Sequence, residues 1–392
     1  MTERKLRIGV AGLGRAFVLM WPALGHHPKI ELVAAADPRD EARARFAAEY
    51  GGLAYPSVDA LCADADIDAV YVATPHEFHA ENAITAARNG KHVLVEKPMA
   101  LSLEECHAMI EAARNSGVHL VVGHSHSFDA PIARTRELIA AGTFGSLRMI
   151  TAVQFTDFLY RPRRPEELAP AAGGGVVLNQ APHHVDIARL LGGGMVKSVR
   201  ALTGAWDRER PVEGAYSALL AFANGAFATL TYSGFAHFDS DEFAGWIAES
   251  GYPKKEDEYG ATRALLAGTK SPAEELALKN ARNYGAEGSA LRLSPRVHQH
   301  FGLMIASCDR ADLRPGPKGI TIYGDDTRSF EPVPIPAIPR SEVIEELYAA
   351  IFEGKKPLHS GEWSLATMEV CLAMQQSARE GREIQLKHQV AV

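Results

Sequence analysis

A glycine-containing segment near the N-terminus has the residue types that bind a phosphate group. Gly12-Leu13-Gly14-Arg15-Ala16-Phe17 follows the apolar run Leu6–Ala11, which is typical of a buried strand, and opens a helical pattern. Glycine allows a tight turn and a close backbone approach, and the N–H groups at a helix start attract anions. The third position of this fingerprint is usually Gly or Ala but is Phe17 here, so the helix should pack differently. We expect a pyrophosphate at Gly12, Gly14, Arg15 and Ala16.

A second feature, Asp37, indicates which dinucleotide this is. It ends the next expected strand, Glu31–Ala36, where a carboxylate can accept hydrogen bonds from the adenosine ribose. Its charge would repel the 2′-phosphate of NADP, whereas the nearby Arg39 could pair with that phosphate. Asp37 before Pro38 also fits a helix N-cap, and both roles can hold together. The sequence predicts NAD, with NADP less favoured.

The elements around these residues form a regular series up to about residue 124. Short apolar runs alternate with helical patterns, which is typical of a parallel sheet covered on both faces. The expected strands are Leu6–Ala11, Glu31–Ala36, Ala69–Ala73, His92–Val95 and His119–Val122. The expected helices are Arg15–Gly25, Asp40–Tyr50, Ala80–Asn89 and Leu103–Ser116, the last with a capping box of Ser102 and Glu105. We predict an α/β protein whose residues 1–124 form a doubly wound Rossmann domain.

Residues 125–392 have a different pattern, which predicts a C-terminal α+β domain. Longer alternating segments indicate an open, mainly antiparallel sheet: Leu147–Phe155, Ser198–Ala205, Ala215–Phe222 and Phe227–Tyr232, with a hairpin turn at Asn224-Gly225. A polar stretch at 235–292 is expected to be a helical insertion. Strands should resume near Arg296 and Ile320, and the helices Ser341–Phe352 and Trp363–Glu380 should close the chain.

Composition favours a small-molecule partner. The net charge of −7 and the isoelectric point near 6.2 argue against a nucleic-acid surface. The chain has no apolar run long enough to span a bilayer, and Arg15 interrupts the stretch that resembles a signal peptide, so we expect a cytoplasmic protein without membrane partners. Four cysteines lie far apart without metal-ligand spacing, so no metal is expected: Cys62, Cys106, Cys308 and Cys371.

The motifs taken together resemble one family. In chain order they are Gly12-x-Gly14, Ala73-Thr74-Pro75-x-x-x-His79, Glu96-Lys97-Pro98, and Gly173-Gly174-Gly175 followed by His183 and Asp186. Their order and spacing resemble the Gfo/Idh/MocA family of oxidoreductases, which pair a Rossmann domain with an open antiparallel-sheet domain. The resemblance covers nearly the whole chain, and its most specific element is the Glu-Lys-Pro tripeptide. It implies that the C-terminal domain, residues 125–392, binds substrate and mediates oligomerisation.

The resemblance implies roles at the reacting end of the cofactor. Residues just after strand ends should surround the nicotinamide ribose: Thr74, Pro75, His79, Glu96 and Lys97. Lys97 would hold the substrate hydroxyl, although a surface lysine is usually only a solvated charge. His183 would be the base that removes the hydroxyl proton, because histidine titrates in the useful range. A histidine at a helix start can instead simply bond to backbone.

One position departs from the family pattern. The family usually has an aspartate four residues before the base, and this chain has Asn179, which we assign to the catalytic set. An amide can hydrogen-bond to substrate or histidine but cannot stabilise an imidazolium by charge. Asp186, within helical reach of His183, could replace that charge or could be a surface aspartate.

A closer likeness suggests the substrate class. Phe238-Asp239-Ser240-Asp241-Glu242-Phe243, the Trp246 segment and the stretch from Phe301-Gly302 to Tyr323-Gly324 look like those of phthalate 4,5-dihydrodiol dehydrogenases. A phthalate-type cis-dihydrodiol would be oxidised to a catechol, and its carboxylates could meet the arginines of a loop. Expected substrate contacts are Arg161, Arg163, Arg164, His124, His126 and Asp186, although a solvated basic loop and packed histidines remain alternatives.

Two other functions fit the same motifs. The first is a sugar or inositol dehydrogenase, which would need hydroxyl-binding groups and little positive charge. The second is a nucleotide-binding regulator without catalysis, which the presence of Lys97 and His183 disfavours. The resemblance also implies a homo-oligomer, a dimer or tetramer that associates through the open sheet.

Overall fold

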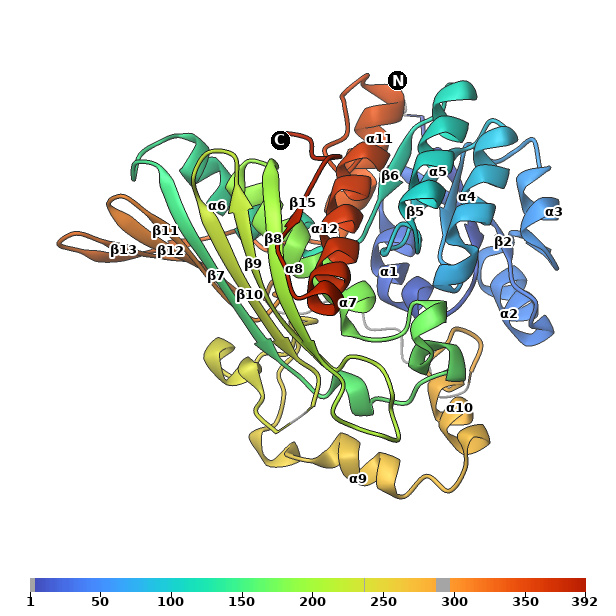
Figure 1. Ribbon diagram of the computed structural model, residues 1–392. Helices are drawn as coiled ribbons and strands as arrows, with labels where there is room; N and C mark the ends of the chain where they lie inside the picture. The colour runs from blue at the N-terminus through green and yellow to red at the C-terminus, as the bar shows by residue number, and fades with distance from the viewer. Residues whose placement is uncertain (1–3, 236, 287–296) are drawn as a thin grey trace. The chain divides into compact units, whose positions relative to one another are not determined.

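The computed structural model describes residues 4–235, 237–286 and 297–392 (Figure 1). The chain divides into two compact units. The described residues of Met1–His124, Leu276–Ser294 and Pro336–Leu365 form the first unit, and those of Ser125–Glu275, Pro295–Ile335 and Ala366–Val392 form the second. Segments from the C-terminal half of the chain thus return to the unit that holds the N-terminus.

The first unit contains a parallel sheet of six strands in the order β3-β2-β1-β4-β5-β6. The strands are β1 (Leu6–Ala11), β2 (Ile30–Ala36), β3 (Leu53–Tyr55), β4 (Ala69–Val72), β5 (His92–Val95) and β6 (Leu120–Val122). All four residues of β4 are buried, as expected for a strand covered on both faces. This sheet confirms the predicted doubly wound Rossmann fold, and β3 is the strand that the sequence did not predict.

Helices follow the strands of this unit: α1 (Arg15–His26), α2 (Asp40–Tyr50), α3 (Val58–Cys62), α4 (His79–Arg88) and α5 (Leu103–Asn115), with α11 (Ser341–Phe352) later in the chain. The predicted capping box of α5 is confirmed, since Ser102 accepts from the Glu105 N–H and the Glu105 carboxylate accepts from the Ser102 N–H. The predicted N-cap role of Asp37 is wrong. Helix α2 begins at Asp40 with Arg39 as its N-cap residue, because the Asp37 carboxylate is turned toward other donors.

The second unit contains a mixed sheet of nine strands in the order β14-β13-β12-β11-β7-β10-β9-β8-β15. The strands are β7 (Leu147–Phe155), β8 (Val196–Gly204), β9 (Ala215–Phe222), β10 (Phe227–Ser233), β11 (Leu303–Cys308), β12 (Ala311–Gly316), β13 (Gly319–Gly324), β14 (Arg328–Pro332) and β15 (Ile384–Gln385). The β7–β10 pair is parallel and the other pairs are antiparallel, which confirms the predicted, mainly antiparallel sheet. The predicted hairpin at Asn224-Gly225 joins β9 to β10, and Gly225 has the positive φ of 87° that such a turn requires.

Helices cover one face of this second sheet. Helix α6 (Ala130–Ala140) packs on β12 and β13, and α8 (Ala181–Gly192) packs on β7 and β10. The short α7 (Val176–Asn179) precedes α8, every residue of α8 is buried, and most of α12 (Gly361–Glu380) also belongs to this unit. On the other face, side chains such as Ser217 and Leu219 of β9 are exposed between buried neighbours. The sheet is therefore open on one side.

The segment 235–292, predicted as an insertion, is partly helical. It contains a 3-10 turn at Ser240–Ala244, an isolated bridge between Ile247 and Pro253, and the helices α9 (Ala261–Ala267) and α10 (Pro272–Asn280). Part of this segment and the strand expected near Arg296 lie outside the described residues. Strands resume at β11, and the expected strand around Ile320 is β13.

Candidate active site

The turn between β1 and α1 leaves room beside its backbone. Gly12 has a φ of 96°, and a Cβ there would come within 2.8 Å of the Ala73 carbonyl oxygen at the end of β4, so only glycine fits. A Cβ at Gly14 would meet nothing closer than Asn283 Oδ1 at 4.0 Å. Gly14 precedes α1, and no acidic residue lies in the first turn, where Arg15 and Ala16 stand. An uncapped helix start beside open space fits the pyrophosphate of NAD.

The Asp37 carboxylate lies next to this turn and is almost completely buried. Its Oδ2 accepts the Leu13 N–H at 2.8 Å and an Arg39 Nη2–H at 3.0 Å. Its Oδ1 accepts the Arg39 N–H and Nε–H, both at 2.9 Å. These four donors fill the usual acceptor capacity of a carboxylate. A ribose hydroxyl could therefore bind this carboxylate only by replacing one of these hydrogen bonds.

Arg39 is held from other sides as well. Its guanidinium donates to the Leu13 carbonyl at 2.8 Å and to the Tyr284 carbonyl at 3.1 Å. Tyr284 comes from the segment after α10, far along the chain. Its completely buried ring packs edge-on against Phe17, with ring centroids 5.1 Å apart. Phe17, the unusual third residue of the glycine fingerprint, therefore packs against a ring from the insertion.

The loops that follow β4 and β5 are tied together by His79. Its Nδ1 lies 2.8 Å from the Pro98 carbonyl oxygen, its Nε2 lies 2.9 Å from the Thr74 carbonyl oxygen, and the side chain is completely buried. Burial lowers the pKa of His79. Thr74 also accepts a hydrogen bond at Oγ1 from Asn82. His79 therefore links the Thr74-Pro75 loop to the Glu-Lys-Pro tripeptide through two backbone carbonyls.

The Glu96 side chain anchors the Glu-Lys-Pro tripeptide. Its buried carboxylate accepts the Tyr71 hydroxyl hydrogen at 2.6 Å and is bonded by the His124 backbone, and burial raises its pKa. Lys97 is half-buried at the end of β5, and the His124 side chain is buried. The Glu96 side chain is therefore buried and bonded within the protein, whereas part of the Lys97 side chain is exposed.

In the second unit, His183 lies on α8 within a cluster of rings. Its ring centroid is 4.8 Å from that of His126 and 4.8 Å from that of Phe301. Phe301 also packs against the His126 ring at 5.1 Å and lies parallel to Tyr232 on β10 at 6.3 Å. All four side chains are at least nine-tenths buried. The predicted base His183 and the predicted substrate contact His126 therefore lie in one cluster of aromatic rings.

The surroundings of His126 favour its positively charged form. Its Nδ1 lies 2.7 Å from Asp129 Oδ2, and its Nε2 lies 3.4 Å from Glu249 Oε1. Burial lowers the pKa of His126, but the charges and hydrogen bonds of Asp129 and Glu249 outweigh burial and raise it to about 9. A buried imidazolium next to His183 can attract an anionic group of a substrate.

Asp186 and Asn179 bond to other parts of this unit. The Asp186 carboxylate accepts the hydroxyl hydrogens of Ser127 and, at 2.9 Å, of Thr367. The Asn179 Nδ2 donates to the carbonyls of Gly173 at 3.0 Å and Gly175 at 2.7 Å. Asp186 thereby fixes the segment that carries His126, and Asn179 fixes the glycine triplet before α7.

The three arginines of the predicted basic loop all have partners within the protein. Arg161 donates to Asp157 at 2.7 Å, and a third of its side chain is exposed. Arg163 is buried, donates to the Phe158 carbonyl at 2.6 Å and stacks 3.6 Å from the centre of that ring. Arg164 lies 3.7 Å from Glu167. Of the three, Arg161 combines a charge-assisted contact with the largest exposed fraction.

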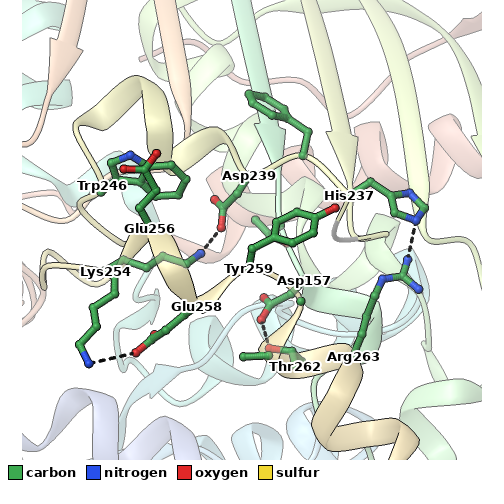
Figure 2. Close-up of a pocket in the computed structure, with 15 residues that line it drawn as sticks. Asp157, His237, Asp239, Trp246, Lys254, Glu256, Glu258, Tyr259, Thr262 and Arg263 are labelled. Carbon is green, nitrogen blue, oxygen red and sulfur yellow. Dashed lines mark hydrogen bonds and ion pairs between the residues drawn. The ribbon is translucent and has the colours of Figure 1, made fainter.

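A cavity of about 170 Å³ opens beside Arg161's partner Asp157. Its wall is formed by Thr156 and Asp157 at the end of β7 and by the insertion, including Lys254 and Thr262. Figure 2 shows the Asp157 carboxylate bonded to Thr262 and the Lys254 ammonium beside Asp239 on this wall. The insertion therefore contributes polar side chains to the cavity that lies beside the end of β7.

Sequence reasoning missed several residues of these clusters. Asp129 stands three residues after His126 and could have been found from that spacing. Glu249, Phe301 and Tyr284 are distant in the chain from the residues they contact, and no local pattern marks them.

Comparison with known families now identifies the class of protein. Residues 6–124 match the family model described as an oxidoreductase family with an NAD-binding Rossmann fold, and residues 132–248 match the Gfo/Idh/MocA C-terminal domain. The chain belongs to the Gfo/Idh/MocA oxidoreductase family. It is an NAD-binding oxidoreductase, as the motifs predicted.

Individual relatives narrow the comparison. The chain is 45% identical to the 1-carboxy-3-chloro-3,4-dihydroxycyclohexa-1,5-diene dehydrogenase of Comamonas testosteroni over 94% of each chain. A crystal structure from Bordetella bronchiseptica RB50, assigned to a dehydrogenase, matches with a TM-score of 0.92 at 40% identity, covering 97% of this chain and 100% of that one. A levoglucosan dehydrogenase in complex with NADH and levoglucosan shares the fold, with a TM-score of 0.73 at 21% identity over 97% and 99% of the two chains.

Within the part of the chain that the structure describes, no helix is both long and apolar enough to cross a bilayer. The His, Cys, Asp and Glu side chains of this same part form no group of three or more that could hold a metal ion.

Proposed function

We propose that this enzyme oxidises a cyclic cis-dihydrodiol that carries a ring carboxylate and releases the corresponding catechol. The observation that carries the proposal is the cationic His126, held by Asp129 beside His183 within the ring cluster. A carboxylated ring is complementary to a buried positive charge among aromatic side chains. The Comamonas testosteroni relative, whose name specifies a carboxylated dihydroxycyclohexadiene, supports the same substrate class.

The reaction needs a hydride acceptor and a base. Bound NAD would supply the acceptor for the hydride of the carbinol carbon. In our proposal His183 takes the hydroxyl proton and Lys97 holds the hydroxyl oxygen by its ammonium group. The resulting hydroxy-ketone loses a ring proton and gains a hydroxyl proton as it tautomerises to the aromatic catechol. Asn179 acts by fixing the Gly173–Gly175 turn, and Asp186 by fixing the segment of His126.

For the cofactor we propose residues 1–124 as the NAD-binding domain and residues 125–392 as the substrate domain. The first turn of α1 would hold the pyrophosphate, and Asp37 would hold the ribose in exchange for an Arg39 bond. Thr74, Pro75, His79, Glu96 and Lys97 would line the nicotinamide end. The Asp37 charge favours NAD over NADP.

A screen of NAD reduction tests this proposal. Purified enzyme is incubated with NAD and, separately, with carboxylated cis-dihydrodiols, neutral cis-dihydrodiols, sugars and inositols. We expect the highest kcat/KM for a carboxylated dihydrodiol and the ultraviolet spectrum of a catechol in its product. A preference for sugars or inositols would refute the proposed substrate class while leaving the family assignment intact.

We further propose a cytoplasmic homo-oligomer, a dimer or tetramer, that associates through the open face of the second sheet. Large apolar side chains are exposed on its strands, including Leu202 at 62%, Leu219 at 47% and Phe227 at 41%. Light scattering of the purified protein tests the assembly: Leu219→Lys should shift it toward the monomer, and an unchanged mass would refute this interface.

A further inference from the structure

The insertion presents one carboxylate, that of Glu249, at the tip of a tight hairpin. The hairpin runs from Trp246 to Lys254 and is closed by hydrogen bonds from the Lys254 N–H to the Trp246 carbonyl at 2.8 Å and from the Ala248 N–H to the Tyr252 carbonyl at 2.8 Å. Its first residue, Trp246, has a left-handed backbone with a φ of 58°. This conformation is uncommon for a bulky residue and is retained where surrounding contacts hold it.

His300 holds the hairpin from the side. Its N–H donates to the Glu249 carbonyl at 3.1 Å, and its Nε2 lies 2.8 Å from the Ile247 carbonyl oxygen. His300 directly precedes Phe301, the ring that packs on His183. The backbone of Glu249 is therefore fixed next to the ring cluster, and only its side chain is left to move.

The Glu249 side chain contacts the ring of His126 and acts electrostatically on Arg161. Its Oε1 is 3.4 Å from His126 Nε2, and a third of its side chain is exposed. Burial lowers the pKa of Arg161, but the carboxylates of Asp157 and Glu249 outweigh burial and raise it. The Glu249 charge thus acts on His126, the cation that the proposed function assigns to a substrate carboxylate, and on Arg161 of the arginine loop.

The two cations differ in how much they depend on Glu249. His126 is bonded at 2.7 Å to the buried Asp129, and Arg161 is bonded at 2.7 Å to Asp157. Each cation keeps one close carboxylate partner when Glu249 is absent. The 3.4 Å contact of Glu249 is the longest of these, so it is the contact that an incoming anion displaces at least cost.

We propose that Glu249 is an internal stand-in for the substrate carboxylate: it occupies the anion position beside His126, and a carboxylated ring displaces its side chain on binding. This inference rests on the proposed function for its substrate class. It makes Glu249 a specificity-determining residue, because neutral rings gain nothing by displacing it, while only an anion can restore its contacts. Removing the charge should favour carboxylated ligands.

Binding of simple aromatic probes to the full-length enzyme tests the proposal. Calorimetry, with and without saturating NAD, measures the dissociation constants of benzoate and of its neutral analogue benzamide for wild type, Glu249→Gln and Glu258→Gln. Glu258 lies in the same insertion, is mostly exposed and pairs with Lys255 at 3.8 Å, so it is the matched control. A partly exposed ion pair is worth little, so we expect Glu249→Gln to bind benzoate about two- to fivefold more tightly. Benzamide binding and the Glu258→Gln variant should match wild type.

The outcomes separate this inference from the proposed function. Equal or weaker benzoate binding by Glu249→Gln, or no benzoate binding by either protein, overturns the stand-in role. If benzoate binding tightens but no carboxylated dihydrodiol is oxidised, the anion site stands and the proposed reaction fails. If the dihydrodiol is oxidised and its KM is the same in wild type and Glu249→Gln, the reaction stands and the stand-in role fails.

Discussion

Replacing Asp37 by asparagine should change which dinucleotide the enzyme binds. The substitution keeps the shape of the side chain and an oxygen that can accept the Leu13 N–H, but it removes the charge that faces Arg39. Arg39 still donates to the carbonyls of Leu13 and Tyr284, so the loop should keep its conformation. The cofactor should be affected most, but the new Nδ2–H2 group faces the Arg39 N–H and Nε–H donors, so the variant should also lose some stability.

The size of the effect follows from the four donors on Asp37. A hydrogen bond to a charged group contributes about 1.5 to 3 kcal/mol, but a ribose hydroxyl must first replace a bond from Arg39. The net loss in Asp37→Asn should lie near the lower limit, which corresponds to an NADH dissociation constant about tenfold higher. NADPH should bind equally well or better, because its 2′-phosphate no longer meets a carboxylate beside Arg39.

Fluorescence titration with NADH and NADPH measures both constants. Asp40→Asn is the control, since Asp40 has a 90% exposed side chain and pairs with the nearby Arg43. The thermal unfolding midpoint should be similar for wild type and Asp40→Asn and lower for Asp37→Asn, and the same scan checks that each protein is folded. A properly folded Asp37→Asn variant whose NADH constant stays within about twofold of wild type, or whose NADPH binding weakens, would refute the assignment of Asp37 to the ribose.

Three further predictions concern other parts of the molecule. Lys97→Ala and His183→Ala should each lower kcat by orders of magnitude with a nearly unchanged NADH dissociation constant, and turnover close to wild type would exclude their roles. The pKa of His126 is raised to about 9, above its ordinary 6.5. Its stabilising contribution, at most about 3 kcal/mol, is therefore complete below pH 6.5 and is lost as pH rises through about 9. In urea titrations the stability difference between wild type and His126→Gln should shrink over that interval, and a constant difference would contradict this prediction. Tyr284→Ala should cost about 3 to 5 kcal/mol by emptying the space beside Phe17, whereas Tyr284→Phe loses only the hydroxyl bond to Glu49 and should cost about 1 kcal/mol; equal losses in urea unfolding would show that the ring packing is unimportant.

Much of the fold could be predicted because its signals are local. The capping box at Ser102 and the Asn224-Gly225 turn each specify a backbone conformation through adjacent residues, and both are present. Strand β3 was missed because three residues, Leu53–Tyr55, are too few to show a period. The N-cap prediction for Asp37 failed because a tertiary partner, the Leu13 N–H, competes for its carboxylate.

The candidate site was harder to predict because its contacts join distant segments. The type and spacing of residues pointed to His126 and His183, but nothing local places Glu249 beside the first or Phe301 beside both. In the arginine loop, the sequence does not show which of the charges are available to a ligand. It displays three equivalent charges, yet Arg163 is buried and occupied by the Phe158 carbonyl and ring, a difference that only packing determines.

The central claim is that this NAD-binding oxidoreductase converts a carboxylated cis-dihydrodiol to a catechol. The most direct measurement follows NADH absorbance and the product spectrum together when the enzyme is mixed with NAD and such a substrate. We predict one NADH and one catechol for each dihydrodiol consumed. No NADH from any carboxylated dihydrodiol, or NADH formed with a product that is not aromatic, would contradict the claim.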